Sequence, residues 1–151
     1  MSASARLAEL GVRLPEVVAP LASYVPAVRT GDLVFTSGQL PMAGGKLVAT
    51  GKVGAGVTLE EAKAMARICA LNALAAVDAL AGIDAVTRVI KVVGFVASAP
   101  GFNGQPNVVN GASELLGEVF GDGGAHARSA VGVSELPLDA PVEVELIVEV
   151  G

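Results

Sequence analysis

The sequence predicts an α+β fold of two layers, in which a mixed sheet carries two helices on one face. Two observations predict this fold. The expected elements follow the order β-hairpin, helix, strand, helix, strand, strand, and a helix that connects two strands of one sheet places those strands parallel. In residues 142–150, Val142, Val144, Leu146, Val148 and Val150 alternate with Glu143, Glu145, Ile147 and Glu149. That alternation indicates a strand with one buried face.

The N-terminal residues form an arm before the first strand. Residues 2–11 can form a short helix that carries Leu7 and Leu10, and two prolines, Pro15 and Pro20, then hold the chain extended.

A β-hairpin is expected next. Tyr24–Arg29 and Leu33–Ser37 have the composition of strands, and the tight turn Thr30-Gly31-Asp32 between them contains a glycine that can take a positive φ. The following stretch, Met42–Gly56, holds five glycines around Leu47-Val48. We expect a loop with one brief strand there.

The first long helix is expected over Leu59–Ala81. Thr58 and Glu61 have the spacing of a capping box, and Gly82 supplies a C-terminal stop. At about 100° per residue, the helix has an apolar and a charged face. The apolar face carries Ala62, Met65, Cys69, Ala76 and Leu80, and the charged face carries Glu60, Lys63, Arg67 and Asp78.

A long strand, a loop, a second helix and another strand complete the middle of the chain. Val86–Ala97 is rich in β-branched residues and is expected to be buried on both faces, with Gly94 as a bulge or a point of close approach. A Gly/Pro/Asn-rich loop follows at Ser98–Asn107. Apolar residues then recur at helical spacing from Val108 to Val119, before a glycine at position 121, and Arg128–Leu136 is a further strand.

The 151 residues match the size of one domain, so residues 1–151 are expected to share a single core. The sheet face opposite the helices is apolar along Val86–Ala97, and the chain has no element left to cover it. Association with further copies of the chain is the natural way to bury such a face.

Composition excludes several functions. Fifteen acidic and ten basic residues give a net charge of −5, which is the wrong sign for a nucleic-acid partner. The single cysteine, Cys69, excludes an intramolecular disulfide and a multi-cysteine zinc site. No uninterrupted apolar run of about 18 residues occurs and the first twenty residues carry four charges, so we expect no membrane partner and a cytoplasmic location.

Sequence motifs near the C-terminus resemble those of a known family. Ala127-Arg128-Ser129-Ala130-Val131, Leu136-Pro137 and Val142-Glu143-Val144-Glu145 resemble the C-terminal signature of the RidA/YjgF imine deaminases. Further matches occur upstream in the same order as in the family: Tyr24-Val25, Phe35-Thr36-Ser37-Gly38-Gln39, Pro41, Phe95-Val96 and Val109-Asn110. The resemblance covers most of the chain.

This resemblance implies a chorismate-mutase-like fold, a homotrimer and clefts between subunits. An arginine and a carboxylate that act with water need no metal or organic cofactor, so none is expected. The resemblance implies that Arg128 binds the substrate carboxylate, that Glu143 positions the attacking water and that Tyr24 walls the pocket. It also implies that Asn110 lies near the pocket and that Ser37 and Gly38 supply backbone to its floor. The extended arm and long Ser98–Asn107 loop resemble a long-form subgroup. The sequence departs from many members at Ala130, where they have cysteine, and at His126, where they have proline.

A separate argument points to a site shared between subunits. Only residues 137–141 separate the last two strands, which must therefore run antiparallel. Arg128 and Glu143 each lie near a strand start, so we expect them at opposite ends of the sheet, on the order of 20 Å apart. Both residues can serve one small substrate only if two chains build the site.

These residue types suit hydrolysis of 2-imino or enamino acids to 2-oxo acids and ammonia. An arginine fork binds a planar carboxylate through two hydrogen bonds, and a carboxylate such as Glu143 can orient or deprotonate water. An alternative is a non-catalytic module that binds small carboxylates, which would need Arg128 but not Glu143. A ribonuclease ranks last, because the chain is acidic, has one histidine and lacks stacking platforms.

Three of these residues also have purely structural interpretations. Arg128 and Glu143 could form ordinary ion pairs, and Tyr24 could be a core or interface residue. His126 and Cys69 are given structural roles and no catalytic one.

Overall fold

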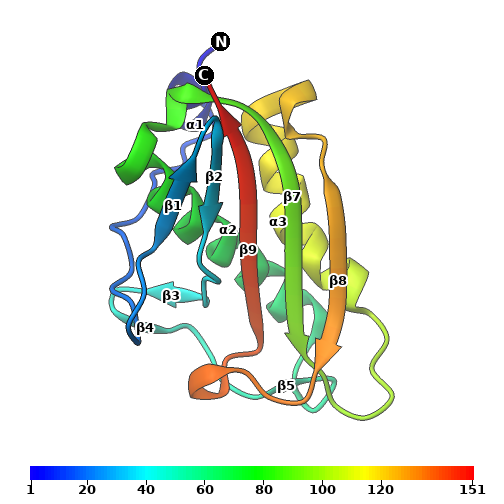
Figure 1. Cartoon of the computed structure of the whole chain (residues 1–151). Helices are drawn as coiled ribbons and strands as arrows, with labels where there is room; N and C mark the ends of the chain where they lie inside the picture. The colour runs from blue at the N-terminus through cyan, green and yellow to red at the C-terminus, as the bar shows by residue number, and fades with distance from the viewer.

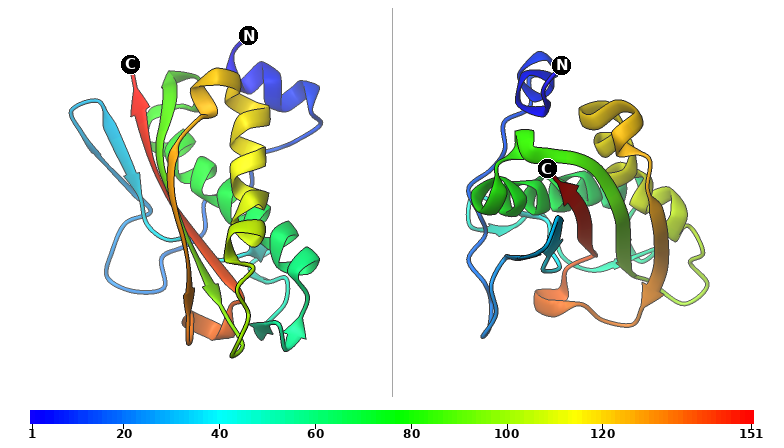
Figure 2. Two further views of the ribbon diagram at one scale, coloured as in Figure 1. Left: turned by 90° about the vertical axis from the view of Figure 1, so that its right-hand side faces the viewer. Right: turned by 45° about the horizontal axis from the view of Figure 1, so that its top comes forward.

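The computed structural model describes residues 1–151 and contains a five-stranded mixed sheet with helices packed on one face (Figure 1). In order across the sheet, the strands are β1 (Ala27–Thr30), β2 (Leu33–Thr36), β9 (Val142–Val150), β7 (Val86–Ala97) and β8 (Ala127–Val133). The helices α2 (Leu59–Ala81) and α3 (Gln105–Phe120) cover the same face, and the short α1 (Ala3–Glu9) packs against α3 (Figure 2). The expected two-layer α+β architecture is confirmed.

The strand directions follow from the two crossover helices. β7 pairs parallel with β8 through the α3 connection, and antiparallel with β9 on its other side. β2 pairs antiparallel with both β9 and β1. β8 and β9 are therefore antiparallel, as expected, and β7 lies between them.

The first strand of the hairpin begins three residues later than predicted, whereas the second begins at Leu33 as predicted and ends at Thr36. β1 begins at Ala27 because Pro26 has no amide hydrogen to offer the ladder, and Gly31 has the positive φ (57°) that the turn requires. The glycine-rich stretch forms two small pairs of strands where one brief strand was expected. They are β3 (Met42–Ala43) with β4 (Lys46–Leu47), and β5 (Lys52–Val53) with β6 (Gly56–Val57).

The predicted bounds of α2 are confirmed. Thr58 Oγ1 accepts from the Glu61 amide at 3.1 Å, Glu61 Oε2 accepts from the Thr58 amide at 3.2 Å, and Gly82 ends the helix with a φ of 83°. The predicted apolar face is buried except for Leu80, which is 46% exposed. Residues 78–80 are all exposed, since the last turn extends beyond the packed layer.

Buried apolar residues form one core of 27 side chains, most of them Val, Ala and Leu, between the sheet and the helices. By length and composition alone, α2 could cross a membrane, with a mean hydropathy of 1.5 over its most apolar window. However, 56% of that window is buried inside this structure. This is the pattern of a helix at the centre of a core.

The other sheet face has no covering element. On the helix side of β7, Val89, Val92 and Val96 are completely buried, whereas Val93 and Phe95 on the opposite side are only partly buried. The expectation that β7 is buried on both faces is therefore wrong for the single chain. Phe35 and Val131 are more than 40% exposed and belong to the same uncovered face, because Val131 pairs with Phe95 and Phe35 with Ile147 of β9.

The boundaries of two other segments differ from the predictions. The loop after β7 ends at Gly104, because Pro106 is accommodated in the first turn of α3. β8 ends at Val133, before the predicted Leu136. Of the two roles predicted for Gly94, close approach is confirmed, since a Cβ there would lie 2.4 Å from Val109 Cγ2.

Gly111 lets α2 and α3 pack closely, which gives the first testable prediction. A Cβ at Gly111 would lie 1.9 Å from the Lys63 carbonyl oxygen, whereas a Cβ at Gly117 on the same helix would meet nothing within 4 Å. We expect Gly111→Ala to destabilise the fold by about 1–3 kcal/mol through overpacking. Gly117→Ala, the matched control, should stabilise it by up to about 1 kcal/mol, because alanine favours helix. Urea unfolding measures both changes, and equal effects would contradict the packing shown.

Candidate functional site

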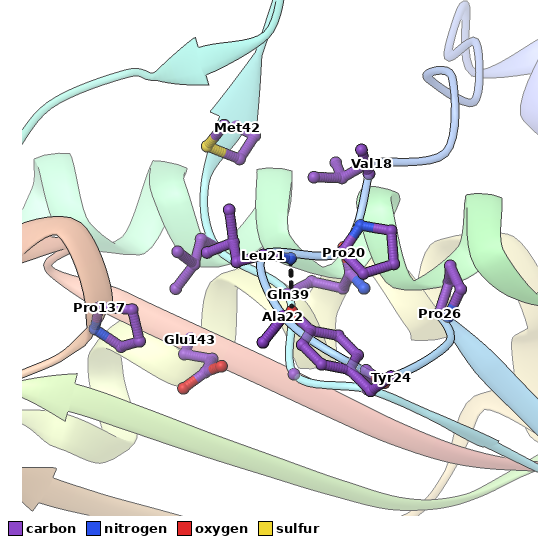
Figure 3. Close-up of a pocket in the computed structure, with 14 residues that line it drawn as sticks. Val18, Pro20, Leu21, Ala22, Tyr24, Pro26, Gln39, Met42, Pro137 and Glu143 are labelled. Carbon is purple, nitrogen blue, oxygen red and sulfur yellow. Dashed lines mark hydrogen bonds between the residues drawn. The ribbon is translucent and has the colours of Figure 1, made fainter.

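A pocket of about 540 Å³ opens beside Glu143, between the N-terminal arm and the loop that follows β2 (Figure 3). Four predicted site residues line it: Tyr24, Ser37, Gly38 and Glu143. The structure therefore brings this subset together in one chain. Arg128 and Asn110 do not line this pocket.

Glu143 projects from the uncovered face of the sheet. Its neighbours Val142 and Val144 are completely buried under α2, so the alternation of β9 places Glu143 on the opposite side. Its carboxylate has no hydrogen-bond partner within the chain and is the only charged group that lines the pocket. Burial, and then the negative charge of Glu145, raise the pKa of Glu143 above the ordinary range of a carboxyl group.

Gly38 lies directly against this carboxylate. A Cβ at Gly38 would lie 2.3 Å from Glu143 Oε1, so only glycine leaves room for the carboxylate in this position. Ser37 and Gln39 hold the glycine in place through backbone bonds. The Ser37 amide donates to the Pro26 carbonyl at 2.8 Å, and Gln39 exchanges two backbone hydrogen bonds with Val144 at 2.8 and 3.0 Å.

The Ser37 hydroxyl is committed to the fold, because it donates to the Val25 carbonyl at 2.6 Å. Tyr24 connects this floor to the arm. Its phenolic oxygen accepts a hydrogen bond from the Leu21 amide at 3.2 Å, the contact drawn in Figure 3. Tyr24 is 45% exposed and therefore belongs to the pocket wall and not to the core.

Arg128 is held on the other side of the sheet by the first turns of α3. Its Nη1 donates to Asn110 Oδ1 at 2.8 Å and to Ser113 Oγ at 3.3 Å, and its Nη2 donates to the Pro106 carbonyl at 3.3 Å. These bonds use three of the five guanidinium N–H donors. The Nε–H and one Nη2 hydrogen have no partner in the chain, and they can bind a carboxylate.

Ser113 and His126 extend the contacts of Arg128. His126 Nδ1 lies 2.6 Å from the Gly124 carbonyl, which can only accept, so Nδ1 carries the hydrogen. In the neutral ring, Nε2 then accepts from the Ser113 hydroxyl at 2.8 Å, and the Ser113 oxygen is free to accept from Arg128. Sequence reasoning missed Ser113, although it lies three residues after Asn110 on the same helix face.

Within one chain, Arg128 and Glu143 lie on opposite faces of the sheet. Arg128 pairs with Val92 of β7 and Glu143 with Phe95, so they are three residues apart along that strand and two strands apart across the sheet. Their Cα atoms are thus about 14 Å apart. The expectation of opposite sheet ends and about 20 Å is wrong, because β8 begins beside Lys91 in the middle of β7. The sheet itself separates the two side chains.

Cys69 is completely buried on α2, with its Sγ 3.7 Å from the Val142 carbonyl oxygen. Burial, and secondarily the charge of Glu143, raise the pKa of the Cys69 thiol. The thiol therefore stays protonated and serves packing, as its helix face predicts. No three His, Cys, Asp or Glu side chains are grouped as metal ligands.

Comparisons with known proteins find relatives of similar sequence and fold. A protein named TCP17 from Trypanosoma cruzi is 45% identical over 98% of this chain and 94% of its own. The structure of Atu1372, a protein of unknown function from Agrobacterium tumefaciens, is 46% identical, with a TM-score of 0.91 over 99% of this chain and 92% of that one. Escherichia coli TdcF, solved with bound serine, is 25% identical, with a TM-score of 0.67 over 90% of this chain and 94% of that one.

The family model described as "YjgF/chorismate mutase-like, putative endoribonuclease" matches residues 4–150. The chain belongs to the YjgF/chorismate mutase-like family.

Proposed function

We propose that this protein hydrolyses 2-imino acids, or their enamine tautomers, in clefts formed between copies of the chain. The observation that carries the proposal is that the polar groups form two separate half-sites, one around Arg128 and one around Glu143, and that neither is complete by itself. Arg128 offers two unpaired donors on one face of the sheet, and Glu143 offers an unpaired carboxylate on the other. Each half supplies what the other lacks, and the sheet prevents their meeting within one chain.

The assembly that would join the halves is a closed ring, which we take to be a homotrimer. Arg128 lies on the edge strand β8, whereas the Glu143 pocket is bordered by the arm and the loop after β2, toward the β1 edge. Joining two different surfaces in a head-to-tail manner produces a ring when the rotation closes. The uncovered apolar face, which includes Phe35 and Val131, would then be buried inside the ring.

The chemistry requires only groups of this chain and water. Arg128 binds the carboxylate through Nε–H and Nη2–H and so fixes the position of the neighbouring imine carbon. Glu143 takes a proton from water as the water oxygen bonds to that carbon. Glu143 then returns this proton to the nitrogen, which gives a carbinolamine. The hydroxyl proton of the carbinolamine next passes through Glu143 to the same nitrogen, the C–N bond breaks as the C=O bond forms, and a 2-oxo acid and ammonia leave. The raised pKa of Glu143 makes it a better base than an ordinary carboxylate near neutral pH.

The serine bound to TdcF supports this proposal, because a relative of 25% identity holds a small molecule with an amino-acid carboxylate. The endoribonuclease label of the family model is a weaker guide for this chain, whose net charge is −5.

The direct test generates imines in place with an amino-acid oxidase and follows the appearance of the 2-oxo acid. Addition of the protein should accelerate that step in proportion to its concentration. Heat-denatured protein is the control. An unchanged rate, together with tight binding of 2-oxo acids, would instead indicate a carboxylate-binding module.

A further inference from the structure

The pocket beside Glu143 is larger and more apolar than the proposed reaction needs. Its volume of about 540 Å³ is within the range of pockets that enclose whole small-molecule ligands. In the single chain, a three-carbon imino acid with its reacting carbon near Glu143 would fill only the part of this space next to Glu143, and its carboxylate would point to the Arg128 of a neighbouring copy. The remaining space lies along the arm, where residues 18–22 and Met42 form the far wall (Figure 3).

The arm is held in place over the pocket by specific contacts. The Leu21 amide donates to the Tyr24 hydroxyl at 3.2 Å, and the Tyr24 amide donates to the Ala22 carbonyl at 3.0 Å. These bonds fold the segment back on itself next to the pocket floor. Leu21 lines the pocket and is 53% exposed in the single chain, so its side chain is available to a ligand in the pocket.

The chemistry of the wall selects one kind of ligand group. Val18, Leu21 and Met42 offer apolar surface, and Glu143 is the only charged side chain on the lining. An acidic substrate side chain would be repelled by Glu143. The polar lining side chains besides Glu143 are Ser37, Gln39 and Tyr24, and residues 18–22 and Met42 of the far wall offer none, so a polar substrate side chain along that wall would lose hydration without gaining side-chain partners. An apolar substrate side chain would bury its own surface against this wall, and it would also cover the exposed side chain of Leu21.

We propose that the arm segment Val18–Ala22 forms a specificity pocket for the side chain of 2-imino acids with long apolar side chains, of the size of leucine, methionine or phenylalanine. This inference rests on the proposed function and names its substrate class. The arm therefore acts as one wall of the binding site as well as a connection between α1 and β1.

Binding of the products tests the inference without requiring turnover. Isothermal titration calorimetry on the full-length protein should show 4-methyl-2-oxopentanoate, the leucine-type 2-oxo acid, binding about tenfold more tightly than pyruvate. This ratio is below what complete burial of three carbons would give, because the pocket is partly open. The same preference should appear in kcat/KM when leucine and alanine are supplied to the oxidase.

Leu21→Ala tests the role of the arm. It should reduce the ratio of the two dissociation constants about fivefold, because three carbons of the apolar wall are removed. The matched control is Val17→Ala, which shortens another partly exposed arm side chain that does not line this pocket. Both side chains are at least 39% exposed, so neither change should affect folding.

The possible outcomes separate the inference from the proposed function. A preference for the longer acid that is lost in Leu21→Ala and kept in Val17→Ala supports the specificity pocket, whether or not imines are hydrolysed. Selective binding without turnover would overturn only the deaminase function. Equal binding of the two acids would overturn the specificity pocket even if imines are hydrolysed, and failure to bind either acid would overturn both.

Discussion

Arg128→Lys should lower kcat/KM for a 2-imino acid by about 100-fold. The arginine uses three donors to fix itself on Asn110, Ser113 and Pro106 and keeps two for the substrate. Lysine has three donors on a single nitrogen at the end of a flexible stem. It therefore cannot keep the hydrogen bonds to α3 and also present two coplanar donors to a carboxylate. The loss of one or two charge-assisted hydrogen bonds, each about 1.5–3 kcal/mol, accounts for this magnitude.

The measurement is steady-state kinetics of imine hydrolysis together with calorimetric binding of the 2-oxo acid, which should weaken in parallel. Arg67→Lys is the matched control, because Arg67 pairs with Glu118 between α2 and α3, away from both half-sites. Full activity of Arg128→Lys, with circular dichroism unchanged, would show that this arginine does not anchor the carboxylate.

Glu143→Gln should reduce kcat by about 100-fold or more, the usual contribution of a positioned general base, and leave binding of a 2-oxo acid within about threefold of wild type. The amide keeps the shape of the side chain but cannot accept the proton from water. Glu149→Gln, on the same strand and the same face, is the control and should keep its activity. A Glu143→Gln variant that turns over normally would reduce the site to a carboxylate-binding module.

The same substitution should raise the melting temperature at pH 7 by a small amount. The folded protein raises the pKa of Glu143 by burial and by the charge of Glu145, so the ionised form is less favourable in the folded than in the unfolded chain. The stability that this group contributes is present below its unfolded pKa and is lost as pH rises through the folded pKa. Above the unfolded pKa the wild type progressively loses this contribution, whereas glutamine never ionises. This gain in melting temperature should disappear at pH values below the ordinary pKa range of a glutamate side chain.

The activity of the wild type should rise with pH over the range in which the stability contribution of Glu143 falls. The proposed reaction requires the base form of Glu143, so kcat should fall as pH decreases through a pKa above that of an ordinary glutamate. Glu145→Gln removes the neighbouring charge and should shift this acid limb to lower pH.

Elements defined by local signals were predicted to the residue. The bounds of α2 follow from the capping box at Thr58 and from Gly82, and the bounds of β9 follow from strict alternation over Val142–Val150. The motif residues around Glu143 also gather in one pocket, because Ser37 and Gly38 directly follow a strand that pairs with β9.

Features that depend on pairing between distant segments could not be predicted in this way. The antiparallel relation of β8 and β9 was predicted correctly. The residue of β7 beside which β8 begins, however, depends on the length of the α3 crossover, and it determines the separation of Arg128 and Glu143. Leu21 was missed because only the bend held by Tyr24 places the arm against the pocket. Nothing in the local sequence around Leu21 specifies that contact.

The most direct test of the shared site is to mix the two inactive variants. Arg128→Lys and Glu143→Gln each leave one half-site intact, so exchange of subunits between the two proposed homotrimers would create clefts with an intact arginine from one chain and an intact glutamate from its neighbour. With equal amounts and random exchange, about a quarter of the wild-type activity should return, since each interface then has an even chance of receiving each intact residue. Native mass spectrometry verifies the trimers and their exchange. Verified exchange without recovered activity, or a chain that stays monomeric at all concentrations, would contradict a site built by two subunits.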